Sequence, residues 1–273
     1  MIFIQTHVIL IIGGEFPVHQ EVTMTGESIL IVEDDGVIAL RIHELLTKAG
    51  YQVSDPVAFG EDAIELIARA PPDLVLMDIE LMGYIDGIET ARQIRQRSDI
   101  PVIYLTAYAD DRRLAQVKET APYGYIVKPF MDRELLATID MALHRHKIDV
   151  KLKEREHLYR AVVDNVSEII ILFDSETRTL LEVNPAFFTV LGYAKPDVPP
   201  LVISDILAGT PEETRIWTNG ICSGQWKRGE GRLKCRDGTI RSFEIAASVI
   251  TRRNGNTLIS MIARELQTSC VMK

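Results

Sequence analysis

Cysteines are scarce in this sequence and follow no regular spacing. The chain of 273 residues has three, Cys222, Cys235 and Cys270, and they form no CxxC pair. This pattern excludes a disulfide framework and offers no zinc-ligand spacing. We therefore expect a protein of a reducing compartment, the cytoplasm.

Long apolar runs and an excess of positive charge are missing too. No apolar run approaches the roughly 18 residues that would span a bilayer, so we expect no membrane association. The chain carries 30 Lys and Arg against 39 Asp and Glu, a net charge of −9. This balance argues against a protein whose main task is to bind nucleic acid or a membrane surface. The length suits about two domains.

Residues 1–25 form an N-terminal extension with a weak pattern. Its short apolar stretch is interrupted at Gln5, Thr6 and His7, and no basic segment precedes it, which makes a poor signal peptide. We expect either a poorly ordered extension or translation that starts at Met24. An extra strand or an anchor is the alternative.

From Ser28 onward, short apolar runs alternate with segments that have apolar residues at three- and four-residue spacing. The expected strands are Ser28–Val32, Tyr51–Val53, Leu74–Met77, Val102–Leu105 and Gly124–Val127, with helices at Ile38–Ala49 and Glu61–Ala70. This alternation predicts a parallel sheet covered by helices on both faces. Ligands of such sheets bind outside the carboxyl ends of the strands.

A long helix is expected to follow, from Met131 to about Asn165. Its middle is rich in charge, with Ile148, Leu152 and Leu158 spaced along it. We interpret it as a linker helix whose histidines are solvated. A dimer-forming coiled coil is the alternative, although sustained heptads are absent.

The pattern changes in the last third of the chain. We expect strands at Glu168–Asp174, Thr179–Asn184 and Asn256–Glu265, helices at Pro185–Leu191 and Glu212–Ser223, and a hairpin that turns at Asp237-Gly238. Two strands, helices and three more strands predict an antiparallel α+β domain.

Acidic residues gather where the strands of the first domain end. Glu33 and Asp34 follow the first strand, and Asp78 ends the third. Carboxylates this close repel one another, and a Mg²⁺ ion with its preference for oxygen ligands resolves the conflict. Asp35 is expected to cap the helix that follows.

The same edge should hold a hydroxyl and an ammonium group. Thr106 follows the fourth strand and Lys128 the fifth. Carboxylates, a hydroxyl and an ammonium group suit phosphoryl transfer, in which a carboxylate is the nucleophile and positive charge neutralises the transferring oxygens.

With the motifs VEDD, LVLMDIEL, IDGIETA, YLTAYAD and GYIVKPF in this order, residues 28–146 resemble the receiver domain of two-component response regulators. The resemblance implies a flavodoxin-like (βα)5 fold. It also implies that Asp78 accepts a phosphoryl group from a phosphohistidine on a partner histidine kinase. The loop after Asp78, IELMGYIDG, is slightly longer than in many receivers and lacks their proline, which alters the expected docking face for the kinase.

The resemblance also assigns roles to the other site residues. Asp34, Asp78 and the backbone carbonyl of Glu80 would bind Mg²⁺ directly, and Glu33 would act through a water. Thr106 and Lys128 would contact the phosphoryl oxygens. Tyr125 matches the switch aromatic, which would turn inward when Thr106 is drawn toward the phosphoryl group.

The stretches EVNPAFFTVLGY, SGQWKRGEGRLKCRDGT and SMIARE give the second half a resemblance to a PAS domain. The family implies a curved antiparallel sheet around a small cavity, which senses a ligand or mediates dimerisation. Haem and covalent flavin are not expected, because the axial His and the Asn-Cys-Arg motif are missing. Asn184, Phe187 and Phe188 could line the cavity, but we favour helix capping by Asn184 and core packing by the two phenylalanines.

We thus expect an N-terminal extension (1–25), a receiver domain (26–146), a helical linker (147–160), a PAS domain (161–268) and a tail (269–273). The predicted protein is not an enzyme, because no phosphoacceptor His motif or glycine-rich ATP site follows. It would signal through other proteins, with a homodimer through the linker helix and PAS domain left open. One rival is the front of a hybrid histidine kinase without its catalytic core. Another is a PAS sensor with a degenerate receiver.

Overall fold

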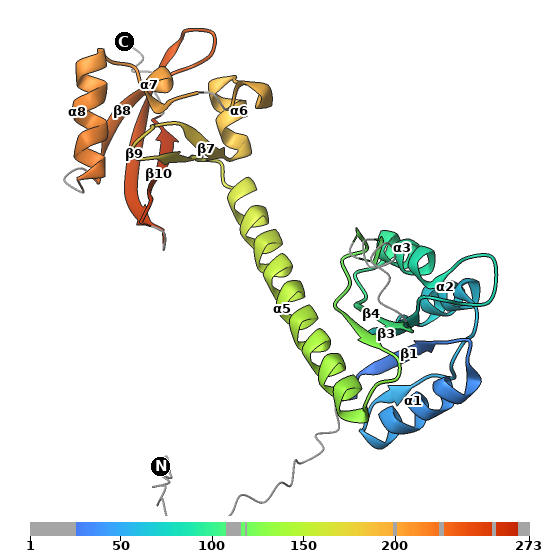
Figure 1. Ribbon diagram of the computed structural model, residues 1–273. Coiled ribbons are helices and arrows are strands. Elements are labelled where there is room, and N and C mark those ends of the chain that lie inside the picture. Colours follow the sequence, from blue (N-terminus) through green and yellow to red (C-terminus); the bar gives the residue numbers. More distant parts are fainter. Residues whose placement is uncertain are drawn as a thin grey trace, which may run out of the picture. The chain divides into compact units, whose positions relative to one another are not determined.

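The computed structural model describes residues 26–107, 116–117, 119–198, 201–223, 227–252 and 255–266. The chain divides into two compact units, residues 1–151 and 152–273 (Figure 1). The expected N-terminal extension and C-terminal tail lie outside the described residues. No helix in the described part is long and apolar enough to cross a membrane.

The first unit contains a parallel five-stranded sheet with the strand order β2-β1-β3-β4-β5. Its strands are β1 (Ser28–Val32), β2 (Gln52–Val53), β3 (Leu74–Asp78), β4 (Val102–Thr106) and β5 (Gly124–Val127). The helices are α1 (Gly36–Lys48), α2 (Gly60–Arg69), α3 (Gly87–Arg97) and the first part of α5 (Asp132–Asp164), which continues past residue 151 into the second unit. The predicted flavodoxin-like arrangement is therefore confirmed.

The uninterrupted apolar strands are explained by burial on both sheet faces. In β1, Ile29 and Ile31 pack in one core cluster with residues of α1 and α5. Leu30 and Val32 belong to a second cluster with residues of α2 and α3. Because both faces are covered, the strands need apolar residues at every position up to their carboxyl ends.

The second unit holds an antiparallel sheet with the order β7-β6-β10-β9-β8. Its strands are β6 (Ile169–Asp174), β7 (Leu180–Val183), β8 (Arg228–Lys234), β9 (Ile240–Thr251) and β10 (Thr257–Glu265), and its main helices are α6 (Pro185–Leu191) and α8 (Pro211–Cys222). The predicted α+β plan is confirmed. A 3-10 turn at Lys195–Asp197 and the short helix α7 (Ile203–Ile206) were not predicted.

The hairpin between β8 and β9 turns as the sequence predicted. Gly238 has a positive φ of 87°, a conformation that glycine adopts without steric cost. Asp237 accepts a hydrogen bond from the backbone N–H of Thr239 (2.8 Å). The turn therefore has the chemistry that an Asp-Gly pair supplies.

Candidate functional site

The candidate site lies at the carboxyl ends of the parallel strands of the first unit. Asp78 ends β3 and Thr106 ends β4, while Glu33 and Lys128 directly follow β1 and β5. These four residues and Asp34 line one cavity of about 590 Å³. The structure thus brings together the side chains that the sequence placed at this edge.

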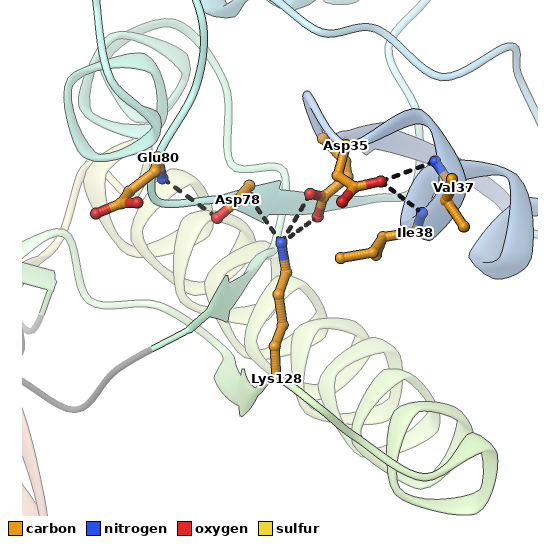
Figure 2. A network of polar contacts seen from close by, with 7 residues as sticks. Asp35, Val37, Ile38, Asp78, Glu80 and Lys128 are labelled. Carbon is orange, nitrogen blue, oxygen red and sulfur yellow. Dashed lines mark hydrogen bonds and ion pairs between the residues drawn. The ribbon is translucent and has the colours of Figure 1, made fainter.

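Lys128 pairs with two carboxylates at once. Its Nζ lies 2.7 Å from Asp78 Oδ2 and 2.6 Å from Glu33 Oε2. Figure 2 shows the extended Lys128 side chain with its Nζ beside the Asp78 carboxylate. The side chains of Glu33, Asp78 and Lys128 are only 0 %, 9 % and 13 % exposed, so these charges depend on one another rather than on water.

Burial changes the titration of this group. It raises the pKa of Glu33 to about 7, and the neighbouring Asp78 adds to the rise while the hydrogen bond from Lys128 opposes it. Burial also disfavours the charged form of Lys128, but its hydrogen bonds to Asp78 and Glu33 outweigh this effect and raise its pKa. The lysine therefore stays charged among the acids.

The acidic residues form a donor set for a hard cation. Glu33, Asp34 and Asp78 each offer a carboxylate oxygen, and these oxygens lie within 4.8 Å of one another. Lys128 Nζ donates a hydrogen bond to Glu33 Oε1 (2.7 Å) and lies 2.6 Å from Glu33 Oε2, so the ammonium group contacts both oxygens of this carboxylate. Oxygen donors in an open, water-accessible cavity suit Mg²⁺, which takes one or two carboxylates and keeps several waters.

Two neighbours of the cavity have roles that the structure makes visible. The Asp35 carboxylate accepts hydrogen bonds from the backbone N–H groups of Val37 (2.8 Å) and Ile38 (3.2 Å), which confirms the predicted cap of α1 (Figure 2). The backbone N–H of Glu80 donates to Asp78 Oδ1 (3.2 Å) and holds that carboxylate. The carbonyl of Glu80 as a metal ligand stays a prediction.

Thr106 and Tyr125 occupy adjacent strands. Thr106 is 8 % exposed, and its carbonyl accepts a hydrogen bond from the Lys128 backbone N–H (2.7 Å). Tyr125 lies on β5 with 58 % of its surface exposed, so its ring is turned to the outside. The peptide bond between Lys128 and Pro129 is cis.

Gly87 is a positioning residue that the sequence analysis did not single out. It begins α3 and donates its N–H to the Ile79 carbonyl (3.0 Å). A Cβ at this position would lie 1.7 Å from the backbone oxygen of Asp78. Only glycine lets α3 start directly against the end of β3. The sequence did contain a signal for this role: the motif IDGIETA has an Asp-Gly pair directly before a helical pattern.

In the second unit, the three residues considered for a cavity, Asn184, Phe187 and Phe188, have structural roles. Phe187 is fully buried in the core and Phe188 packs against it, which confirms the favoured interpretation. Asn184 is the N-cap residue of α6, as predicted, and its carbonyl accepts from the Phe187 N–H (3.0 Å), but its side chain makes no capping bond to the helix. Its Oδ1 instead accepts from Ile170 N (2.9 Å), and its Nδ2 donates to the carbonyls of Val163, Val166 and Glu168.

Comparisons with known families assign both units. Residues 29–140 match the family model of the response regulator receiver domain, and residues 157–225 match that of a PAS domain. The second match ends before β8, β9 and β10.

Three characterised or named proteins illustrate the relationship. The chain is 32 % identical over 119 residues to the transcriptional regulatory protein PdtaR of Mycobacterium tuberculosis, covering 44 % of this chain and 58 % of PdtaR. It is 39 % identical over 118 residues to AfsQ1 of Streptomyces coelicolor, covering 43 % and 52 %. The match to the sensor histidine kinase TmoS of Ectopseudomonas mendocina is weaker, 27 % identical, but covers 90 % of this chain and 27 % of TmoS. The chain thus spans a little over half the length of the first two relatives.

Proposed function

Since the chain carries a response regulator receiver domain followed by a PAS domain, we propose that it acts in two-component phosphorelay signalling. In this proposal Asp78 accepts a phosphoryl group from a phosphohistidine of a partner histidine kinase in the cytoplasm. An Asp78 carboxylate oxygen attacks phosphorus, the phosphorus–nitrogen bond breaks, and the imidazole nitrogen leaves with the electron pair. The product is an acyl phosphate.

One observation carries the proposal: the pairing of Lys128 with both Asp78 and Glu33 inside an acidic cavity. The ammonium group can move from the carboxylates to the incoming phosphoryl oxygens without leaving the cavity. Catalysis of phosphoryl transfer consists mainly of such positioning and charge neutralisation. A lysine on the surface would be neither buried nor already oriented toward the phosphoacceptor.

The acidic residues supply the second positive charge through a cation. We assign Asp34, Asp78 and the Glu80 carbonyl as direct ligands of Mg²⁺, with Glu33 acting through a water. Bound Mg²⁺ would neutralise charge on the transferring phosphoryl oxygens. The carboxylate oxygens within 4.8 Å of one another support this assignment.

The proposed output begins at Thr106 and Tyr125. Phosphorylation adds negative charge and acceptor oxygens beside Thr106. The hydroxyl of Thr106 moves toward them, and the exposed ring of Tyr125 turns into the space that is vacated. The surface around β5 changes as a result. Partner proteins or the PAS domain would bind the changed surface. A second copy of the chain could also respond to it, in a homodimer through the linker helix and the PAS domain.

A second candidate function is favoured by the TmoS match. The alignment covers 90 % of this chain and 27 % of a sensor histidine kinase. The chain would then be the sensory front of a hybrid kinase whose catalytic core is encoded next door. The DNA downstream of the reading frame decides between the two: a kinase core in any frame favours the second candidate.

Intact-mass spectrometry tests the proposed phosphoacceptor. Full-length protein is incubated with acetyl phosphate, with and without Mg²⁺. The proposal predicts addition of one phosphoryl group that requires Mg²⁺ and is lost in Asp78→Asn. A matched Asp73→Asn variant, at the amino end of β3, should be phosphorylated like the wild type, because Asp73 bonds to Ser28 at the other edge of the sheet. Undiminished addition in Asp78→Asn would refute the assignment.

A further inference from the structure

The loop that joins β3 to α3, residues 79–86, forms one wall of the candidate site. Ile79 and Glu80 line the same cavity as Asp78. The Glu80 N–H donates to Asp78 Oδ1 (3.2 Å), as Figure 2 shows, and Glu80 also carries the carbonyl that we assign to Mg²⁺. The path of loop 79–86 therefore decides where a support of the phosphoacceptor and an assigned ligand of the cation are placed.

Loop 79–86 needs a contact that fixes its path. It contains no helix or strand, only a single β-bridge at Met82, and it lacks the proline that many receivers carry there. Ordering such a backbone costs conformational entropy, and a proline lowers that cost by restricting the unfolded chain. In this chain another part of the receiver domain has to hold the loop.

The amino end of α2 supplies the contacts. Phe59, the residue before α2, forms the parallel bridge with Met82. Two residues further along each segment, Glu61 Oε1 accepts a hydrogen bond from the backbone N–H of Tyr84 (2.9 Å). A hydrogen bond to a carboxylate is about twice as strong as one between neutral groups. The outer part of the loop is thus attached to α2 at two points.

Two glycines let α2 and the loop approach this closely. Gly60 is buried, and a Cβ at this position would lie 2.1 Å from Thr90 Oγ1 and 3.0 Å from Ile85 Cγ1. Gly83 lies between the two attachment points of the loop and has a φ of +118°, which residues with a side chain rarely adopt. A Cβ on Gly83 would lie 2.8 Å from Glu61 Oε2. The backbone around Glu61 is therefore shaped to receive the loop.

A role in helix stability alone does not account for Glu61. Acidic residues in the first turn of a helix interact favourably with its dipole, and α2 has two of them, Glu61 and Asp62. Among the described residues, only Glu61 of this pair has a hydrogen bond to loop 79–86. Asp62 thus provides a reference with the same charge in the same turn of the helix.

We propose that Glu61 is a positioning residue for the phosphoacceptor site. Its hydrogen bond to Tyr84 holds loop 79–86 in the path that presents the Glu80 carbonyl to Mg²⁺ and the Glu80 N–H to Asp78. Without this bond the loop has to be ordered when the cation binds, so the affinity for Mg²⁺ falls. The inference rests on the proposed function, because it concerns the cation site of the same domain.

Isothermal titration calorimetry of the full-length chain with MgCl₂ tests this role without a phosphodonor. Glu61→Ala should raise the Mg²⁺ Kd about fivefold, the effect of losing one hydrogen bond that orders the loop. Glu61→Gln keeps an oxygen acceptor for the Tyr84 N–H and should restore most of the affinity. Asp62→Ala removes the same charge and should leave the Kd near the wild-type value. Equal weakening by Glu61→Gln and Glu61→Ala would assign the effect to charge and overturn the positioning role.

Gly83→Ala breaks the same attachment from the side of the loop. The strained φ and the added Cβ push the loop away from Glu61, so the Mg²⁺ Kd should rise at least as much as in Glu61→Ala. Gly255→Ala is the matched control, because Gly255 has a φ of +86° in the second unit and a Cβ there would meet nothing within 4 Å. An unchanged Kd in Gly83→Ala would contradict the proposal.

Phosphorylation by acetyl phosphate separates this inference from the assignment of Asp78. Glu61→Ala should react slowly at low Mg²⁺ and reach the wild-type rate when Mg²⁺ is saturating, whereas Asp78→Asn should gain no phosphoryl group at any Mg²⁺ concentration. A wild-type Mg²⁺ Kd in Glu61→Ala would overturn the role of Glu61 and leave that of Asp78 intact. A wild-type chain that binds no Mg²⁺ would overturn the cation assignment together with this inference.

Discussion

The two units of this chain each bury polar side chains, but they treat them differently. In the receiver domain, Glu33, Asp78 and Lys128 meet at the mouth of the sheet and satisfy mainly one another. In the PAS domain, the fully buried Asn184 bonds to four backbone groups. The lysine shared by the two carboxylates can change its partner, whereas the Asn184 amide bonds only to backbone groups of its own unit.

The contrast separates a site from a structural support. The Asn184 side chain joins the end of α5 to the start of β6 through bonds to their backbone groups. Removing the Asn184 side chain should lower the free energy of unfolding without changing phosphoryl transfer. Losing a member of the charged group should affect both properties, and the following variants test that difference.

Lys128→Met should have the largest effect. It leaves two buried carboxylates face to face, and breaking a buried ion pair from one side costs about 3 kcal/mol or more of unfolding free energy. Phosphoryl incorporation should fall as well. Lys48→Met is the control, because Lys48 forms a 3.9 Å pair with Glu44 in which both side chains are more than half exposed. Urea denaturation compares the two, and equal losses of stability would contradict the buried network.

Asn184→Ala should cost about 2–3 kcal/mol of unfolding free energy, because it leaves several buried backbone groups unsatisfied. Incorporation of phosphate into Asp78 should stay at the wild-type level. Asn165→Ala, which removes one exposed hydrogen bond to the Ala161 carbonyl, should cost well below 1 kcal/mol. A loss of phosphorylation in folded Asn184→Ala would show that the two units do not divide these roles.

Gly87→Ala should destabilise the receiver domain by about 1–3 kcal/mol and slow phosphorylation. The added Cβ would lie 1.7 Å from the Asp78 carbonyl, so the end of β3 must shift. Gly36→Ala at the start of α1 is the matched control, since its Cβ would meet nothing within 4 Å. Thermal unfolding measures the loss of stability, and the rate of mass increase measures phosphorylation. If Gly87→Ala matched the wild type in both, Gly87 would not be a positioning residue.

The stability of the receiver domain should fall as the pH rises from 5 to 7 without Mg²⁺. The folded state raises the pKa of Glu33 from 4.5 to about 7, so the folded chain holds a proton that the unfolded chain releases. This contribution is fully present below pH 4.5 and is lost as the pH passes 7, roughly 2 kcal/mol of it between pH 5 and 7. Glu33→Gln should flatten that part of the urea midpoint profile. Identical profiles would contradict the raised pKa.

Much of the fold followed from local patterns that the structure confirms. Ser28–Val32, Gly124–Val127 and Pro185–Leu191 have the predicted bounds, because apolar runs, turn residues and a proline at the helix start act locally. The short helix α7 was missed since four residues carry too little periodicity. The clustering of Glu33, Asp34, Asp78 and Lys128 was predictable from strand ends. The bonds of Asn184 and the contact of Gly87 with Asp78 were not, because they depend on tertiary packing.

The identity of the phosphoacceptor is the central claim, and chemical trapping tests it most directly. Full-length protein treated with acetyl phosphate and Mg²⁺ is reduced with borohydride, which converts an aspartyl phosphate to homoserine, and the peptides are then sequenced by mass spectrometry. We predict homoserine at position 78 alone, and none without Mg²⁺. Homoserine at position 34 or 35 instead, or an unmodified Asp78 in protein that has gained a phosphoryl group, would contradict the account.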